Sequence, residues 1–306
     1  MRVLVTGGLG FVGHAVVDRL VAAGHCPMAL SSRSDALSGV EGVETVRSDI
    51  GDVRGLTEAV RRCEPDAVCH LAALTRVRDS FEKPIRYFDV NLGGMSALLR
   101  ALDGFKIPVV YASTAAVYGP CEGRIDESQP TLPTNPYGAS KLAAEQLLLY
   151  HARTAAVGAA VLRCFNITGA VGPVGDADPT RIIPKALMVA AGRSSHIDIN
   201  GDGSVIREFT HVADIAAAVV SALECTRVGD TELYNVGSGV EVSMTDVVDV
   251  VEAVTRKKVE RRHHPPKREP SILVADSTKL RAQLRWSPTY TELKPMIDDV
   301  WRMMNA

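Results

Sequence analysis

The sequence predicts an α/β protein in which a Rossmann-type doubly wound parallel sheet is followed by a smaller carboxy-terminal substrate-binding domain. Short apolar runs alternate with longer helical patterns through residue 165, which is typical of a parallel sheet covered by helices on both faces. A glycine-rich segment follows the first run and begins the first helix. The alternation then becomes less regular. We therefore expect one domain over residues 1–165 and a mainly substrate-binding domain over 166–306, with some of its segments returning to the sheet.

The first domain divides into predicted elements in a regular order. The apolar runs predicted to be buried strands are Val3–Thr6, Met28–Ser31, Val43–Arg47, Ala67–Leu71, Val109–Ala112 and Ala160–Arg163. The helical patterns are Phe11–Ala23, which Gly24 ends, Val53–Arg62, Pro84–Leu102 and Tyr137–Ala155. Such alternation implies right-handed crossover connections.

The second half predicts fewer regular elements. Helices are expected over Ile182–Ala191, Val212–Leu223 and Met244–Thr255. Gly169–Pro179 and His263–Pro270 are rich in residues that break regular structure, and both are predicted loops. Asn200–Ser204 is a predicted turn between short strands.

Composition excludes several classes of protein. The net charge of −2 argues against a nucleic-acid-binding protein, which usually carries a basic excess. No apolar run approaches the roughly 18 residues that a membrane span needs, and the run at Met1–Thr6 is too short for a signal peptide. The six cysteines are scattered without a Cys-x-x-Cys pair, so we expect a cytoplasmic protein without disulfides or a metal site.

The glycine-rich segment predicts a dinucleotide site. Gly7, Gly10 and Gly13 have the spacing G-x-x-G-x-x-G between a strand and a helix. Glycines there permit a tight turn and let a pyrophosphate approach the backbone at the helix N-terminus.

Two further segments bear on which dinucleotide would bind. An acidic residue after the second strand favours NAD, whereas a basic one accommodates the 2′-phosphate of NADP. This chain has Ser32 and Arg33 there and no acid until Asp35, which leaves NADP open as an alternative to NAD. Asp49 and Ile50, after the third strand, are placed to meet the adenine, although Asp49 is equally compatible with a simple turn.

Tyr137 and Lys141 are candidates for acid–base chemistry. Positions i and i+4 share one face of a helix, so phenol and ammonium can converge. A nearby lysine lowers a tyrosine pKa, and such a tyrosine can exchange the proton of a sugar hydroxyl. Thr114 ends the fifth strand, at the sheet edge where ligands of open α/β sheets bind.

Together these features resemble the extended short-chain dehydrogenase/reductase superfamily and its NAD-dependent epimerase/dehydratase family, most closely the UDP-glucose (UDP-galactose) 4-epimerase group. The likeness covers nearly the whole chain. It extends to Asp79–Pro84 with Asn91, to Leu162–Asn166, to Val205–Val212, and to Leu273–Lys279 followed by Trp286-Ser287-Pro288.

The resemblance implies a role for each matched position. Tyr137 would be the acid/base, Lys141 its modulator and a ribose ligand, and Thr114 a hydrogen-bonding partner of the sugar. Asn166 and Arg207 would hold a nucleotide diphosphate. The residues expected around the dinucleotide are Gly7, Gly10, Phe11, Val12, Gly13, Ser32, Arg33, Asp49, Ile50, Leu71, Ala72, Ala73, Asn91, Tyr137 and Lys141.

The sequence departs from the group at four places. Cys164 replaces the tyrosine of the L-R-Y-F-N motif, and the acid after the second strand is absent. The R-x-G-D segment is replaced by residues 266–269, in which Arg268 is a candidate substitute for the missing arginine. Leu273 stands where a residue often limits sugar size, so an acetamido sugar stays open.

We therefore expect a nucleotide-sugar 4-epimerase that uses NAD and forms a homodimer through the helices around Asn91–Leu102 and Tyr137–Tyr150. The dehydratases of the same family carry Thr-Asp-Glu where this chain has Thr114-Ala115-Ala116, and alanine has no proton to transfer. Two alternatives stay open: an NADPH-dependent reductase of a nucleotide-activated 4-keto sugar, suggested by Arg33, and a non-catalytic dinucleotide-sensing protein.

Overall fold

A computed structural model describes residues 1–32, 40–154, 157–267 and 270–306 of the chain. Arg33 and Arg268, two of the predicted ligand residues, lie outside these ranges. No helix within the described ranges is long and apolar enough to cross a membrane.

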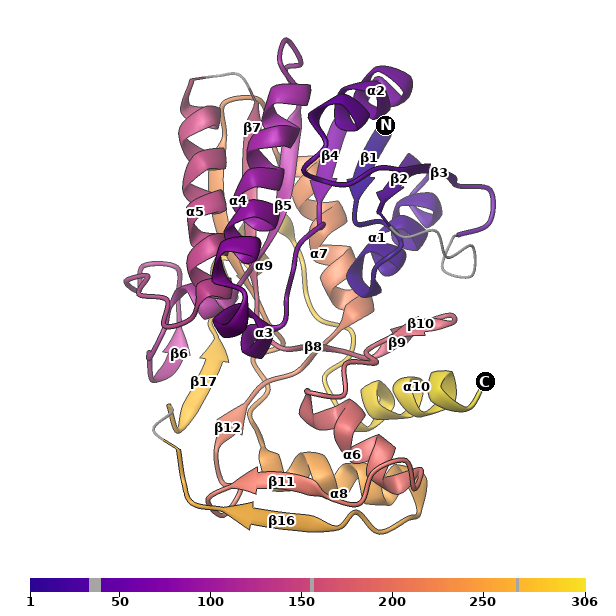
Figure 1. Ribbon diagram of the computed structural model, residues 1–306, viewed down its shortest axis with the longest axis vertical. Coiled ribbons are helices and arrows are strands. Elements are labelled where there is room, and N and C mark those ends of the chain that lie inside the picture. Colours follow the sequence, from indigo (N-terminus) through magenta and orange to yellow (C-terminus); the bar gives the residue numbers. More distant parts are fainter. Residues whose placement is uncertain (33–39, 155–156, 268–269) are drawn as a thin grey trace.

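Seven parallel strands form the central sheet, in the order β14-β7-β5-β4-β1-β2-β3 (Figure 1). Their bounds are β1 Arg2–Thr6, β2 Cys26–Ser31, β3 Glu44–Arg47, β4 Ala67–His70, β5 Pro108–Thr114, β7 Gly158–Cys164 and β14 Thr231–Val236. The first six lie where the sequence predicts strands. The seventh, β14, comes from the second half of the chain and pairs with β7.

Helices cover both faces of this sheet, as the apolar runs predict. One face carries α2 Val53–Cys63, α4 Pro84–Ala101 and α5 Pro136–Arg153; the other carries α1 Phe11–Ala22, α7 Val212–Cys225 and α9 Thr278–Leu284. Side chains of β1 alternate between the two cores: Val3 and Val5 pack with α1 and α7, whereas Leu4 packs with α2 and α4. Burial on both faces is why strands of a parallel sheet are apolar throughout.

The remaining elements lie mostly beyond the carboxyl ends of these strands (Figure 1). Helices α6 Ile182–Ala190, α8 Met244–Thr255 and α10 Leu293–Asn305 share a core with β11 Ile197–Asn200. A second sheet has the order β15-β12-β17-β6. Its strands are β15 Val242–Ser243, β12 Ile206–Arg207, β17 Ile272–Ala275 and β6 Gly123–Ile125. The short helix α3 Val77–Glu82 contacts α4 and α5, and β8 Ile167–Thr168 pairs with β13 Thr210–His211, both of which contact α7.

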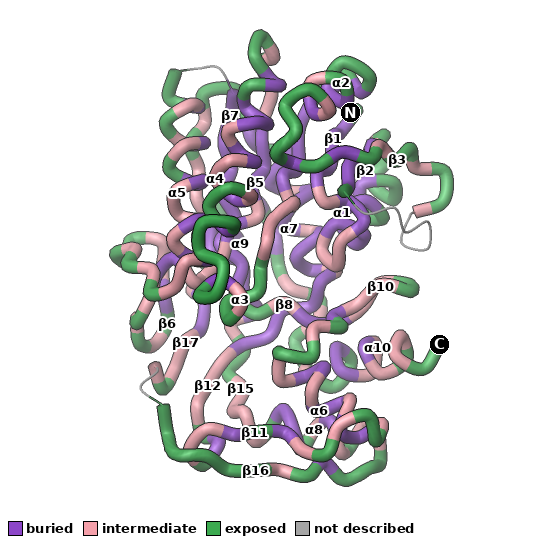
Figure 2. Tube along the Cα trace, in the orientation of Figure 1, coloured by how far each residue is buried: buried purple, intermediate pink, exposed green. Residues whose placement is uncertain are grey.

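Two predicted loops are partly wrong. His263 and His264 belong to β16 Arg261–His264, which pairs in parallel with β11. This strand is largely exposed (Figure 2) and therefore lacks the apolar alternation that reveals a strand in a sequence. The predicted loop Gly169–Pro179 contains a small antiparallel hairpin of β9 Ala170–Val171 and β10 Val174–Gly175.

Candidate active site

The glycine-rich segment forms a close turn between β1 and α1. Gly7 has φ +72°, and a Cβ there would lie 2.8 Å from the backbone nitrogen of Ala72. A Cβ at Gly13 would lie 2.0 Å from the carbonyl oxygen of Gly7. Gly10 is the N-cap of α1, and no side chain caps that N-terminus. The segment therefore presents the positive end of a helix dipole, which suits a pyrophosphate.

Asp49 and Ile50 follow β3. The Asp49 carboxylate accepts a hydrogen bond from the backbone nitrogen of Gly51 at 2.8 Å, which is the simple turn that the sequence left open. Ile50 packs against Gly94 of α4, where a Cβ would lie 2.9 Å from the Ile50 side chain.

A cavity of about 550 Å³ lies between the sheet and the second half of the chain. Its lining includes nine of the predicted site residues: Phe11, Val12, Leu71, Ala73, Thr114, Tyr137, Lys141, Asn166 and Arg207. Other predicted ligand residues in the described ranges lie outside the lining: Gly7, Gly10, Gly13, Ser32, Asp49, Ile50, Ala72 and Asn91. The structure thus joins the residues predicted for acid–base chemistry to those predicted for a diphosphate.

Tyr137 and Thr114 meet at the centre of the cavity. Asn135 caps α5 by accepting a hydrogen bond from the backbone nitrogen of Gly138, and Pro136 begins the helix, which places Tyr137 in its first turn. The Tyr137 hydroxyl is hydrogen-bonded to the Thr114 side chain. Burial raises the pKa of Tyr137 to about 12, against this hydrogen bond and the charge of Arg181. The lowered pKa expected from the sequence is therefore not found, because burial outweighs the groups that favour the phenolate.

Lys141 lies one turn further along α5 and is 2% exposed. Its Nζ donates a hydrogen bond to the carbonyl oxygen of Ala112 at 2.6 Å and lies 4.1 Å from the ring centroid of Tyr111. Burial lowers the pKa of Lys141 to about 7, although the charge of Glu145 opposes that change. Lys141 is thus poised to change its charge near neutral pH.

Asn91, one of the residues expected around the dinucleotide, is buried on α4 and not an exposed helix residue. It is 1% exposed, and its side-chain amide donates to the carbonyl oxygen of Leu74 and to the Ser140 hydroxyl, at 3.1 and 2.9 Å. Its Oδ1 accepts from the backbone nitrogen of Leu74 at 2.8 Å. Asn91 therefore fixes the loop after β4 against α5.

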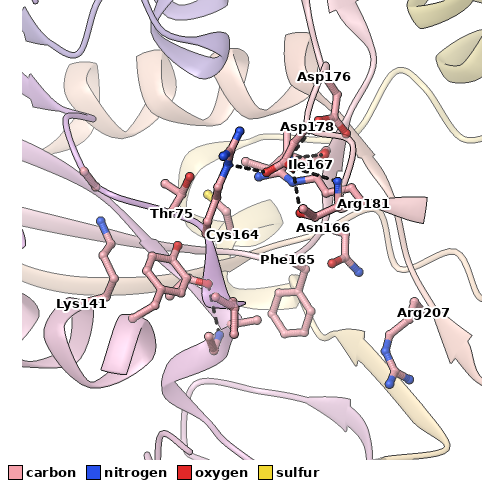
Figure 3. Close-up of a pocket in the computed structure, with 18 of the residues that line it drawn as sticks. Thr75, Lys141, Cys164, Phe165, Asn166, Ile167, Asp176, Asp178, Arg181 and Arg207 are labelled. Atoms are coloured by element: carbon pink, nitrogen blue, oxygen red, sulfur yellow. Dashed lines mark hydrogen bonds and ion pairs between the residues drawn. The ribbon is translucent and has the colours of Figure 1, made fainter. Parts of the chain in front are cut away.

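Asn166 and Arg207 lie at the other end of the cavity, with Cys164 and Phe165 between them and Lys141 (Figure 3). The Asn166 amide donates to the carbonyl oxygen of Glu208 at 3.0 Å, and the pairing of β8 with β13 brings these segments together. The Arg207 guanidinium donates to the carbonyl oxygens of Ile206 and Pro270 at 2.7 and 3.0 Å. Leu273 also lines the cavity.

Five charged residues of the described lining were not singled out from the sequence: Arg76, Arg78, Asp176, Asp178 and Arg181. Arg181 pairs with Asp176, with 3.3 Å between Nη1 and Oδ1, and Arg76 pairs with Asp178, with 3.5 Å between Nε and Oδ2. Burial raises the pKa of Asp176 to about 6. Arg181 precedes an apolar helix directly, which is the one local signal that could have found it.

The described part of the chain brings together no group of three or more His, Cys, Asp and Glu side chains that could hold a metal ion. The side chains of the cavity suit proton exchange at Tyr137, which lies beside a helix N-terminus suited to a dinucleotide and a basic end suited to a diphosphate.

Comparisons with known proteins agree with this geometry. The model of the NAD dependent epimerase/dehydratase family matches residues 3–237. A UDP-glucose 4-epimerase of Streptomyces lividans is 37% identical over 314 residues, which cover 98% of this chain and 95% of that protein. The matches confirm the resemblance to the family.

Solved structures extend the similarity to the fold. The UDP-glucose 4-epimerase of Stenotrophomonas maltophila, with bound NAD and formylated UDP-arabinopyranose, superposes with a TM-score of 0.91 at 32% identity and covers 100% of this chain and 98% of its own. That of Brucella ovis in complex with NAD has a TM-score of 0.90 at 32% identity, with 97% and 96% covered. These structures confirm the predicted fold class.

Proposed function

The chain belongs to the NAD dependent epimerase/dehydratase family, and we propose that it is a nucleotide-sugar 4-epimerase that interconverts UDP-glucose and UDP-galactose. One observation carries the proposal. Tyr137, hydrogen-bonded to Thr114, faces a cavity that has the N-terminus of α1 on one side and Asn166 and Arg207 on the other.

NAD is the proposed cofactor, and the described residues fit it. Gly7 and Gly13 leave no room for a Cβ, and the uncapped N-terminus of α1 suits a pyrophosphate. Phe11, Val12 and Lys141 connect this end to the cavity. NAD, when bound, supplies the acceptor and donor of the C4 hydrogen.

Tyr137 exchanges the proton of the sugar O4 hydroxyl through its own Oη. Thr114 holds the Tyr137 hydroxyl in place. Lys141, one turn along α5 and in the same cavity lining, would favour the phenolate when it is protonated. The Tyr137 side chain is largely buried, and the proton of the sugar hydroxyl leaves and returns through its Oη.

The sugar must present both faces in turn, which requires an anchor away from C4. Asn166 and Arg207 supply that anchor at the diphosphate, so that the sugar turns within the cavity while the nucleotide stays bound. Ala115 and Ala116 carry no acid or base next to Thr114, which fits epimerisation rather than dehydration.

The test is to incubate the purified protein with UDP-galactose and then to separate the two sugar nucleotides. We expect UDP-glucose to form until the two epimers reach equilibrium, without added reductant. The acetamido and uronic counterparts are assayed in parallel, because Leu273 leaves the sugar class open. Failure of all these substrates to give a 4-epimer would overturn the proposal.

An NADPH-dependent reductase of a 4-keto sugar is the second candidate, because the sequence after β2 has the basic Arg33 and no acid before Asp35. Denaturing the purified protein and identifying the released dinucleotide separates the two. NAD supports the epimerase. NADPH, together with stoichiometric loss of its absorbance on adding a keto sugar, selects the reductase.

We further propose a homodimer formed through α4 and α5. These two helices pack side by side, and Ile85, Phe88 and Tyr150 are exposed apolar residues on them. Sedimentation should give twice the chain mass of 32.8 kDa, and Ile85→Glu should reduce it to the monomer. A wild-type monomer would refute this arrangement.

The cysteines are all free thiols, which fits the proposed cytoplasmic location.

A further inference from the structure

A buried ion pair lies directly behind the cavity. Glu145 lies on α5, one turn after Lys141, and Arg163 lies on β7. Arg163 Nη2 is 2.8 Å from Glu145 Oε2, and Arg163 Nε is 3.2 Å from both carboxylate oxygens. The Glu145 side chain is 1% exposed and the Arg163 side chain is 6% exposed. The Ser113 hydroxyl donates a further hydrogen bond to the same carboxylate.

The register of the sheet connects this carboxylate to the site. Ser113 on β5 is opposite Arg163 on β7, and the next pair is Thr114 and Cys164, both of which line the cavity. Glu145 therefore ties the helix that carries Tyr137 and Lys141 to the last residues of two adjacent strands.

We propose that Glu145 is a positioning residue, which Ser113 and Arg163 hold in place so that its carboxylate fixes α5 against the ends of β5 and β7 and maintains the charge of Lys141 beside Tyr137. The role rests on the proposed function for its effect on turnover, because that function uses Lys141 as the modulator of Tyr137. Its effect on Lys141 itself does not depend on which reaction the site performs.

The surroundings of Lys141 explain why one carboxylate matters. Four ionisable groups face the ammonium: Glu145 on its own helix, Tyr111 on β5, Cys164 on β7 and His70 on β4. Burial lowers the pKa of His70 to about 3 and raises those of Cys164 and Tyr111, so these three are neutral near pH 7. Burial also lowers the pKa of Lys141, and Glu145 supplies the negative charge that opposes it.

Tyr137, on the same helix, gains from this arrangement. Its hydroxyl is bound by Thr114, whose strand Glu145 holds through Ser113. A shift of α5 relative to β5 would separate Tyr137 from Thr114 and Lys141 from the carbonyl oxygen of Ala112 at once.

The same ion pair could instead serve only to neutralise Arg163, whose guanidinium lies 4.8 Å from the ring centroid of Tyr118. Removing Glu145 alone would not distinguish these roles, because it would leave a buried guanidinium without a counter-ion and destabilise the fold. Removing both charges together does, because no unpaired charge remains.

The decisive variant is therefore Glu145→Gln with Arg163→Gln. In protein labelled at lysine Cε, the Lys141 signal, assigned by its loss in Lys141→Arg, reports the pKa of Lys141 directly. We expect this pKa to fall by about one unit, the lower end of what one nearby opposite charge contributes, because Glu145 is the charge that most opposes the effect of burial on Lys141. From a wild-type value near 7, the protonated fraction at pH 7 falls roughly fivefold.

Turnover should follow the protonation of Lys141. We expect kcat of the double variant to be roughly fivefold below wild type at pH 7 and to approach it at lower pH, because Lys141 is then charged in both proteins. A matched control removes an exposed ion pair of the same type, Arg2→Gln with Glu64→Gln. In that pair Arg2 Nη1 is 2.8 Å from Glu64 Oε2, and neither residue lines the cavity. That control should titrate and turn over like wild type.

A folded Gln/Gln variant with wild-type Lys141 titration and wild-type turnover at every pH would overturn the proposal and leave the pair a structural one. If that variant does not fold, Glu145→Asp tests the role instead, because it keeps the negative charge but shortens the side chain by one methylene and so moves the carboxylate away from its partners. We expect it to shift the Lys141 pKa or to lower kcat several-fold with KM unchanged. If the Lys141 pKa and kcat both stayed at their wild-type values, the positioning role would be refuted. A shifted Lys141 titration in protein that forms no 4-epimer would refute the proposed function instead, and leave the positioning of Lys141 intact.

Discussion

Replacing Tyr137 by phenylalanine removes one hydroxyl from the centre of the cavity and tests the proton transfer directly. The ring stays, because Tyr137 is 9% exposed and packs edge-to-face against Tyr87 with 6.4 Å between centroids. Thr114 keeps its hydrogen bond from the backbone nitrogen of Ala116 at 3.2 Å. The loss of one buried hydrogen bond should therefore cost about 1 kcal/mol of the free energy of unfolding.

The effect on rate should be much larger. General acid–base catalysis contributes about 10²–10⁴-fold, so kcat for converting UDP-galactose to UDP-glucose should fall by that factor, or about 3–5 kcal/mol in activation free energy. KM should change little, because Asn166 and Arg207, the proposed diphosphate ligands, are untouched. The assay is the initial rate of UDP-glucose formation over a range of substrate concentrations.

A second tyrosine provides the control. The Tyr234 hydroxyl donates to Gln283 Oε1 at 2.9 Å, and this ring lies outside the cavity lining. Tyr234→Phe loses a comparable hydrogen bond and should keep kcat within about twofold of wild type. If folded Tyr137→Phe also turned over at close to the wild-type rate, Tyr137 would not be the acid/base and the mechanism would be wrong.

Three further changes test the cofactor loop, the buried histidine and the substrate anchor. Gly13→Ala would bring a Cβ within 2.0 Å of the Gly7 carbonyl oxygen, so NAD affinity by calorimetry should fall at least about tenfold, whereas Gly93→Ala, with its nearest neighbour atom at 3.8 Å, should bind normally. Burial lowers the pKa of His70 from 6.5 to about 3, so between pH 7 and pH 5 this side chain takes up a proton in the unfolded protein but not in the folded one. The free energy of unfolding, measured by urea titration, should therefore drop by about 2 kcal/mol over that range. A His70→Asn variant with the same pH dependence would contradict this. Arg207→Gln should raise KM for UDP-galactose about tenfold or more with kcat little changed, through loss of charge-assisted contacts, and an unchanged KM would remove Arg207 from the anchor.

The Rossmann half could be predicted because its signals are local. Buried parallel strands are apolar throughout, and the glycine-rich segment lies where a turn must pass close to Ala72. Strand β14 was missed as a sheet member because its place beside β7 depends on a connection through the second half of the chain. Helix α10 was not predicted from the sequence, and its first turn contains Pro295, a residue that often marks the end of a helical pattern.

The candidate site could be predicted only where motifs mark it. Tyr137, Lys141 and Thr114 meet in the cavity as their spacing and strand position suggest. Arg181 and Asp176 come from an irregular loop with no periodicity, so their pairing appears only when the chain is folded. Arg33 and Arg268 lie outside the described residues, and their proposed roles stay predictions.

The charges of the site, unlike its residues, follow from burial. The same desolvation raises the pKa of Tyr137 to about 12 and lowers that of Lys141 to about 7, because it disfavours the phenolate and the ammonium alike. A short sequence motif specifies that the two side chains share a helix face, but it does not specify their charges. The charge of Lys141 also depends on Glu145, which is one turn further along α5 and is held by Arg163 from β7. Acid–base competence in this site is therefore a property of α5 docked on β5 and β7, and it should be lost by changes that leave the Tyr137–Lys141 motif itself intact.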